Sequence, residues 1–154
     1  MGGWKMAFIK ATVPITELPS WAIWERKLIE VMEQAVYVFM EKYTRVDGTL
    51  VWRNELETRD GADDFYESFY NWPLLYLLGG RDDLLTLGIR QWEAVTKQLT
   101  EMGMLHKEFE KGYDWFHQGE SYLYFYFLCM ADPYNTDMID RARRFAGFYL
   151  NEDP

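Results

Sequence analysis

The sequence predicts an all-α protein, and three observations support this prediction. Apolar residues recur at three- and four-residue spacings along most of the chain, which is the period of one helix face. Clusters of Gly, Pro and Asp, which end or begin helices, separate these stretches. No region alternates helical and strand-like patterns as an α/β chain does. The 154 residues fit one domain, residues 1–154.

The first two predicted helices flank a polar loop. Ser20 can cap the first, which runs to about Tyr43 before Arg45–Gly48 breaks it. A short extended piece is expected at Gly48–Trp52. The second helix starts at Asp63 or Asp64 and ends at Gly79-Gly80, a C-terminal signal. Pro73 lies inside this second helix and is expected to kink or interrupt it.

Three further helices complete the pattern. The third runs from Asp83 to about Met102, with Asp82 as its cap and Gly103 as its stop. After a loop, the fourth is expected from Glu120 to Ala131. Thr136 can cap the fifth helix, which ends near Leu150.

A repeat of about 53 residues relates the two halves of the chain. Glu67–Tyr70 and Glu120–Leu123 both read Glu-Ser-aromatic at their start, and each leads into an almost wholly apolar helix. Upstream, Asp47–Leu50 corresponds to Met102–Leu105. A helix that is apolar on all faces must be surrounded, whereas an amphipathic helix can face water. The second and fourth helices are therefore expected to be inner, and the first, third and fifth outer.

This alternation resembles the (α/α)6 toroids of the six-hairpin glycosidases, glucuronyl hydrolases, polysaccharide lyases and N-acylglucosamine 2-epimerases. The segment YTRVDGTLVW (Tyr43–Trp52) is similar to the loop that those folds place after an outer helix. The resemblance implies a carbohydrate-binding pocket at the end where the inner helices begin. Six hairpins of this length would need roughly 320 residues. The chain carries two and a half, so it is expected to be the N-terminal portion of a larger toroid or a short array completed by association.

The polar stretches before the two inner helices hold the candidate site. Carboxylates there can act as general acid and base, and an aromatic face can stack on a sugar ring. The catalytic candidates are Asp63, Asp64, Glu67, His117 and Glu120. The substrate-binding candidates are Arg53, Arg59, Asp60, Tyr113, Asp114, Trp115 and Gln118.

Each candidate group also has a purely structural interpretation. Asp63 and Glu67 fit a helix cap and a capping box. Trp115 can plug the end of the helical array, and His117 can bond a buried carbonyl. His117 and Glu120 share one helical turn, but with two histidines in the chain no metal or other cofactor is expected.

The leading functional hypothesis is glycoside hydrolysis by carboxylate general acid–base chemistry. A lyase or an epimerase on the same fold is the first alternative, with Arg53 and Arg59 as candidates to bind a substrate carboxylate. A helical-repeat scaffold that binds proteins without catalysis is the second.

Charge, apolar runs and the first residues of the sequence limit the classes of partner and the cellular compartment that are expected. The net charge of −9 disfavours nucleic acid. The longest apolar run, Tyr122–Ala131, has ten residues, short of the roughly 20 that span a membrane. No signal-peptide pattern opens the sequence, so a cytoplasmic location is expected. Self-association is expected through apolar flanks of Phe69–Leu78 and Tyr122–Ala131.

Overall fold

The computed structural model describes residues 16–51, 63–110 and 115–150. Within these ranges the chain forms six helices and one small hairpin, which confirms the all-α class. The elements are α1 (Ser20–Tyr43), α2 (Asp63–Tyr66), α3 (Trp72–Leu77), α4 (Asp83–Glu101), β1 (Leu105–His106), β2 (Phe109–Glu110), α5 (Trp115–Ala131) and α6 (Thr136–Tyr149).

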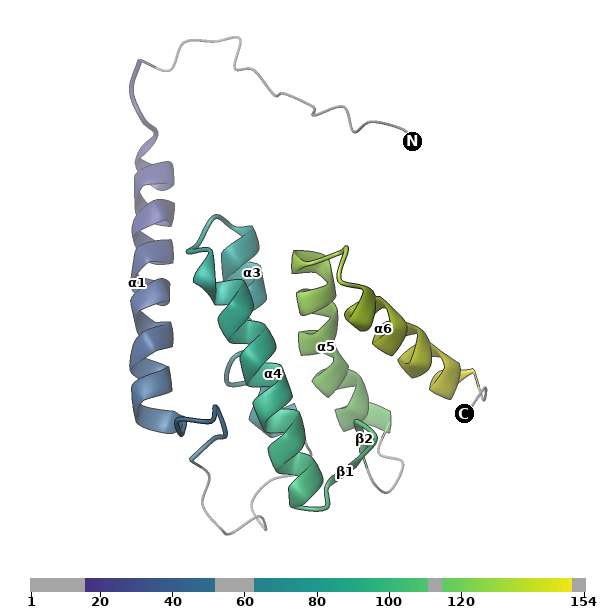
Figure 1. Cartoon of the computed structure of the whole chain (residues 1–154). Coiled ribbons are helices and arrows are strands. Elements are labelled where there is room, and N and C mark those ends of the chain that lie inside the picture. The colour runs from purple at the N-terminus through teal and green to yellow at the C-terminus, as the bar shows by residue number, and fades with distance from the viewer. Residues whose placement is uncertain (1–15, 52–62, 111–114, 151–154) are drawn as a thin grey trace.

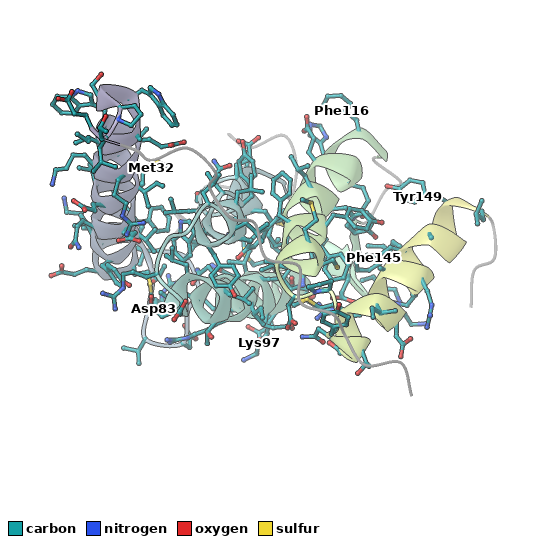
Figure 2. All side chains as sticks on the ribbon, turned by 90° about the horizontal axis from the view of Figure 1, so that it is seen from above. Met32, Asp83, Lys97, Phe116, Phe145 and Tyr149 are labelled. Atoms are coloured by element: carbon teal, nitrogen blue, oxygen red, sulfur yellow. The ribbon has the colours of Figure 1, made fainter. Side chains whose placement is uncertain are left out.

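The helices form an array with α1 and α6 at its opposite ends (Figures 1 and 2). In Figure 1, α3 and α5 run in one direction, and α1, α4 and α6 run in the other. The central helix α3 packs against α1, α4 and α5, and α5 packs against α2, α3, α4 and α6. The amphipathic α4, which was expected to be an outer helix, contacts α2, α3, α5 and β1, so the most apolar segments do not have more neighbours than this helix.

The α1 bounds are those predicted, but the predicted caps of α1 and α6 are wrong. Asp82 is the N-cap of α4, as predicted. Pro19 is the N-cap of α1, and neither α1 nor α4 has a side-chain cap hydrogen bond. Ser20 and Thr136 are instead the first residues of their helices. At α6 the residue before Thr136 has the capping role, since Asn135 Oδ1 accepts a hydrogen bond from the Met138 backbone N–H at 3.3 Å.

Pro73 interrupts the second predicted helix, as expected. The segment divides into α2 and α3, with Pro73 in the first turn of α3, where its missing N–H leaves no intrahelical bond unmade. The predicted extended piece is present in part, as an isolated antiparallel bridge between Thr44 and Leu50.

Two expectations for the region between α4 and α5 are wrong. A β-hairpin, β1–β2, lies where a simple loop was expected, with Leu105 opposite Glu110. Lys107 and Glu108 form its turn with φ angles of 49° and 72°. Such turns usually contain Gly or Asn, so the sequence carried no signal for this hairpin. Helix α5 starts at Trp115 rather than Glu120, which places His117 and Gln118 on a helix.

An aromatic core joins the central helices to α4 and α6. Trp92 of α4 stacks on Tyr66 of α2 at 4.6 Å between ring centroids, and Phe125 and Phe145 meet edge to face at 4.9 Å. The buried Tyr124 hydroxyl donates a hydrogen bond to the Gly88 carbonyl. These buried aromatic residues fill the space between the helices (Figure 2).

Apolar side chains are also exposed on the two central segments, at the flanks where the sequence predicted them. They are Leu77, Leu78, Leu123, Tyr126 and Met130. Helix α1 exposes an even larger apolar set, which was not predicted. No helix in the described ranges is both long and apolar enough to cross a membrane.

Candidate functional site

The candidate site lies where the two central segments begin. Helix α2 packs against α5, and α3 runs beside α5 in the same direction (Figure 1). The structure therefore brings together the segment that contains Asp64 and Glu67 and the helix that contains His117 and Glu120.

Burial confirms the 53-residue register between these segments. Three pairs of equivalent positions are buried in both copies of the repeat: Phe69 with Tyr122, Trp72 with Phe125, and Leu75 with Leu128. In the same register Asp64 is equivalent to His117, and Glu67 is equivalent to Glu120. The four titratable side chains therefore occupy matching places on two neighbouring segments.

Their exposure also matches. Asp64 and His117 are half-buried, while Glu67 and Glu120 are exposed. A half-buried group beside an exposed carboxylate gives two acid–base groups with different hydration, which is what general acid–base catalysis requires.

Aromatic rings lie on the same two segments as these groups. Tyr70 stacks on Phe127 with 6.2 Å between centroids and an interplanar angle of 18°. Phe116, which is 70% exposed, meets the His117 ring edge to face at 5.4 Å. Exposed aromatic faces next to polar side chains are suited to stacking on the C–H faces of sugars. Phe116 was not a candidate from the sequence, although it is adjacent to Trp115.

Gln118 occupies a different environment from the other candidates on α5. It is only 3% exposed and makes its contacts within the protein. Gln118 and Glu120 are two positions apart, and successive helical positions differ by about 100°, so the two side chains project from opposite sides of α5. The structure thus places the amide of Gln118 in the interior rather than beside Glu120.

The remaining candidates are not placed. Arg53, Arg59, Asp60, Tyr113 and Asp114 lie outside the described residues. Asp63 and Trp115 begin α2 and α5, and their side chains are also outside the description.

Two buried hydroxyl groups that follow Glu120 in the sequence were missed by sequence reasoning. Tyr122 is two positions from Glu120, so it projects from the opposite side of α5, where its ring stacks on Phe145 of α6. Ser121 Oγ and Tyr122 Oη are buried without a hydrogen-bond partner among the described residues. Burial raises the pKa of Tyr122 far above its usual value, so the phenol is neutral at physiological pH. The sequence feature that could have pointed to these two residues is their position directly after Glu120, at the start of an otherwise apolar stretch of helix. In the described ranges, no three His, Cys, Asp or Glu side chains gather as a metal site would require.

A separate ionic cluster ties the β-hairpin to α4 and α6. Arg141 Nη1 binds Glu93 Oε1 at 2.5 Å and Asp137 Oδ2 at 3.4 Å, and Arg141 and Arg144 both bind Glu108. The Arg141 guanidinium also lies 5.5 Å from the Phe125 ring centroid. These pairs make Arg141 and Arg144 of α6 part of a salt-bridged surface.

Removing Arg141 is expected to destabilise the fold. Its side chain and that of Glu108 are mostly buried, and breaking a buried pair costs more than breaking an exposed one. We expect Arg141→Met to lower the free energy of unfolding by about 2–3 kcal/mol. Arg143→Met is the matched control, since the Arg143–Asp140 pair is exposed, and its cost should stay below about 0.5 kcal/mol. Urea denaturation measures both, and equal losses would contradict the role of the cluster.

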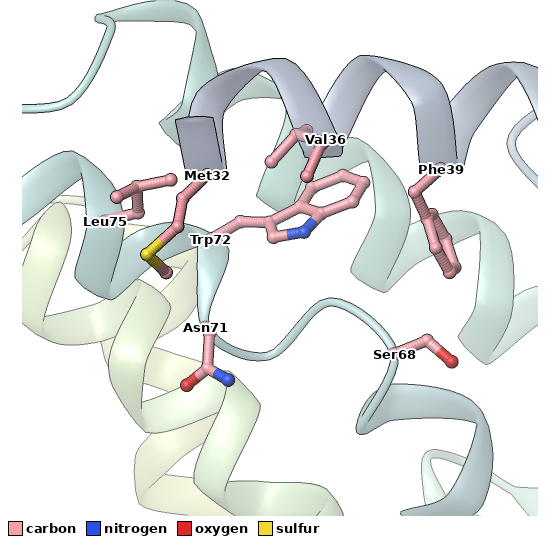
Figure 3. A pocket seen from close by; sticks show the side chains of 8 residues that line it. Met32, Val36, Phe39, Ser68, Asn71, Trp72 and Leu75 are labelled. Carbon is pink, nitrogen blue, oxygen red and sulfur yellow. The ribbon is translucent and has the colours of Figure 1, made fainter. Parts of the chain in front are cut away.

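A shallow groove of about 250 Å³ separates α1 from α3 (Figure 3). Trp72 forms its floor between Val36 and Met32, and Phe39 lies beside it, with 5.9 Å between the Phe39 and Trp72 ring centroids. The polar side chains of Ser68 and Asn71 line one edge. The groove is thus mostly apolar and lies beside the segment that carries Glu67.

A family model described as Domain of unknown function (DUF8034) matches residues 8–154. No curated protein and no solved structure matches the sequence. The family match covers the whole array and both polar stretches, and it assigns no chemistry to them.

Proposed function

We propose that this chain, which belongs to the family Domain of unknown function (DUF8034), is a carbohydrate-active module that hydrolyses glycosidic bonds. We further propose that its hairpins form part of an (α/α)6-type toroid whose pocket opens where the central helices begin. The chemistry is carboxylate general acid–base catalysis by Glu67 and Glu120, assisted by Asp64 and His117.

One observation carries this proposal. Glu67 and Glu120 are exposed at equivalent positions of two central segments that run side by side. Adjacent packed helices have axes about 8–10 Å apart, and glycoside hydrolysis uses carboxyl separations of about 5–10 Å. Glu67 directly follows α2, which packs against α5, and this neighbourhood supports a carboxylate pair as the catalytic unit.

The aromatic rings support a sugar as the ligand. Phe116 precedes His117, and the Tyr70–Phe127 stack lies on the same two segments as the carboxylates. A pocket that combines exposed rings with carboxylates binds both faces of a pyranose, because its C–H groups are apolar and its hydroxyls are polar.

The test is a screen of the protein against neutral and uronate-containing oligosaccharides. We expect new reducing ends to appear with at least one substrate class, and nuclear magnetic resonance of the first product gives its anomeric configuration. Unsaturated products absorbing in the ultraviolet would instead indicate the lyase alternative. Absence of both cleavage and binding across the panel would overturn the proposal.

A helical-repeat scaffold is the second candidate, favoured by the exposed apolar side chains of α1. It predicts protein binding through α1 and no turnover. The screen separates the two, because a scaffold leaves every oligosaccharide intact.

A further inference from the structure

The turn of the β1–β2 hairpin is held in a conformation that its residues disfavour. Lys107 and Glu108 form a two-residue turn with φ angles of 49° and 72°. Both angles lie in the left-handed region, where a side chain crowds the backbone, and hairpin turns of this kind are usually built from Asn and Gly. Contacts outside the turn must therefore compensate for this strain.

The hairpin itself supplies little of that compensation. It pairs Leu105 with Glu110 and His106 with Phe109. A two-stranded hairpin on its own is at best marginally stable in water. The conformation of the turn therefore depends on the helices against which the hairpin packs.

The Glu108 carboxylate makes the first of these contacts. One of its oxygens binds Arg141 and the other binds Arg144, and these two arginines lie about one turn apart on α6. The Glu108 and Arg141 side chains are only 15% and 13% exposed. Because Arg141 also binds Glu93 of α4, the ion pairs join the turn to two helices.

Phe109 makes the second contact. Its ring meets those of Tyr122 and Phe145 edge to face, with 6.3 and 5.7 Å between centroids. The two residues before Glu108 are exposed. The side chains of Glu108 and Phe109 therefore attach the tip of the hairpin, residues 106–109, to the helices.

The base of the hairpin is fixed independently of this tip. Leu105 is buried, and β1 packs against α4. The Met104 backbone N–H donates a hydrogen bond to the Leu99 carbonyl at 2.9 Å. Figure 1 shows the hairpin where α4 ends, beside the first turns of α5. A fixed base next to a weakly attached tip allows the tip to move without unfolding α4.

The surroundings of Glu108 also favour such a motion. Glu108 lines a hollow of about 800 Å³ together with residues of α4 and α6. Arg144 is 34% exposed, so water reaches this ion pair from the hollow. The charged groups can then be hydrated as they separate, which lowers the cost of breaking the pair.

We infer that residues 106–109 form a strap that opens away from α6 while the helices stay folded, and that Glu108 is the latch that keeps the strap closed. Opening relaxes the strained turn and uncovers the faces of Tyr122 and Phe145 against which Phe109 packs. The strap thus gives this end of the α5–α6 interface an open state as well as the closed one. This inference concerns the conformation of the fold and is independent of the proposed hydrolysis.

Hydrogen exchange of the full chain under native conditions tests the strap. Local opening exposes little surface, so exchange through it is insensitive to low urea concentrations, whereas exchange through global unfolding depends steeply on urea. We expect the protection factors of the His106 and Phe109 amides to be at least about tenfold below those of Trp92–Leu99 in α4, and independent of urea below the unfolding transition. Equal protection and equal urea dependence of the two sets would overturn the strap.

Two variants test the latch. Glu108→Gln keeps the size of the side chain and removes its charge, so the protection of the tip amides should fall by a further factor of about ten or more, again without urea dependence. Arg144→Met breaks the same contact from α6 and should act in the same direction. Unchanged tip protection in either folded variant would show that Glu108 is not the latch.

A third variant tests the strain. Lys107→Asn places a residue that adopts positive φ more readily and leaves the ion pairs of Glu108 in place, so tip protection should rise about threefold or more. Arg143→Met is the matched control, because Arg143 pairs with the exposed Asp140, and it should leave tip protection unchanged. Equal or weaker protection in Lys107→Asn would overturn the role of the strained turn.

Discussion

Replacing Trp92 by Ala is expected to lower the free energy of unfolding by about 3–5 kcal/mol, the range for removing a large aromatic side chain from a core. Trp92 is almost completely buried. Its ring contacts Tyr66 at 4.6 Å, Phe125 at 5.4 Å and Tyr124 at 5.6 Å between centroids. These rings belong to α2 and α5, so the cavity would open where three elements meet.

Guanidinium chloride denaturation followed by circular dichroism measures this loss. Trp92→Phe should cost clearly less, because it retains a ring and Trp92 Nε1 has no hydrogen-bond partner among the described residues. Trp24→Ala is the matched control for tryptophan removal, since that side chain is exposed, and should change stability by less than about 0.5 kcal/mol. A Trp92→Ala loss no larger than that of Trp24→Ala would refute this account of the core.

The helices were predictable from the sequence where apolar spacing and terminators agreed. The bounds of α1 follow from its apolar period and from the break near Arg45, and Pro73 correctly marked the division between α2 and α3. The repeat was equally informative, because equivalent apolar residues such as Phe69 and Tyr122 must be buried in both units.

The errors arose where local sequence was ambiguous. The octapeptide from Tyr113 to Glu120 was interpreted as loop, but α5 begins at Trp115. The apolar residues that follow in the same helix, such as Tyr122 and Phe125, are buried, and their packing outweighs weak local propensity at the helix start. The β-hairpin was missed because its turn uses Lys107 and Glu108 at positive φ without a glycine. The predicted N-cap of α6 was wrong by one residue, because Asn135 and Thr136 are both good cap residues and the structure uses Asn135.

The candidate site was predicted at the level of segments rather than side chains. Two apolar helices with matching starts predicted that the segments containing Glu67 and Glu120 are neighbours, and α5 does pack against α2 and α3. The direction of the Gln118 side chain depends on the rotation of α5 about its axis. Because the predicted helix started at Glu120 rather than at Trp115, the sequence did not predict that Gln118 is buried. The sequence did not show that the apolar side of α1 is exposed. Apolar residues at helical spacing identify an apolar helix face, but they do not show whether another element covers that face.

Glu120→Gln and His117→Gln are each expected to lower turnover at least 100-fold on any oligosaccharide that the protein cleaves. Both changes keep the approximate size of the side chain and remove its acid–base capacity. Because Glu120 is exposed and His117 is half-buried, the melting temperature should change little, so a rate loss reports on chemistry rather than folding. Glu67→Gln tests the equivalent position of the first repeat in the same assay.

Glu101→Gln provides the matched control for the carboxylates. Glu101 is exposed at the end of α4 and pairs with Lys97 at 3.5 Å, outside the segments that carry the candidate site, so its turnover should equal that of the parent protein. Steady-state rates and melting curves are measured together for all four variants.

If His117→Gln and Glu120→Gln retain full turnover, the proposed roles are wrong at those positions. The remaining candidates would then be Asp63, Asp64 and Glu67, all from the first repeat. In that case catalysis would depend on α2 and the turn after it, and the equivalent positions of α5 would serve packing alone.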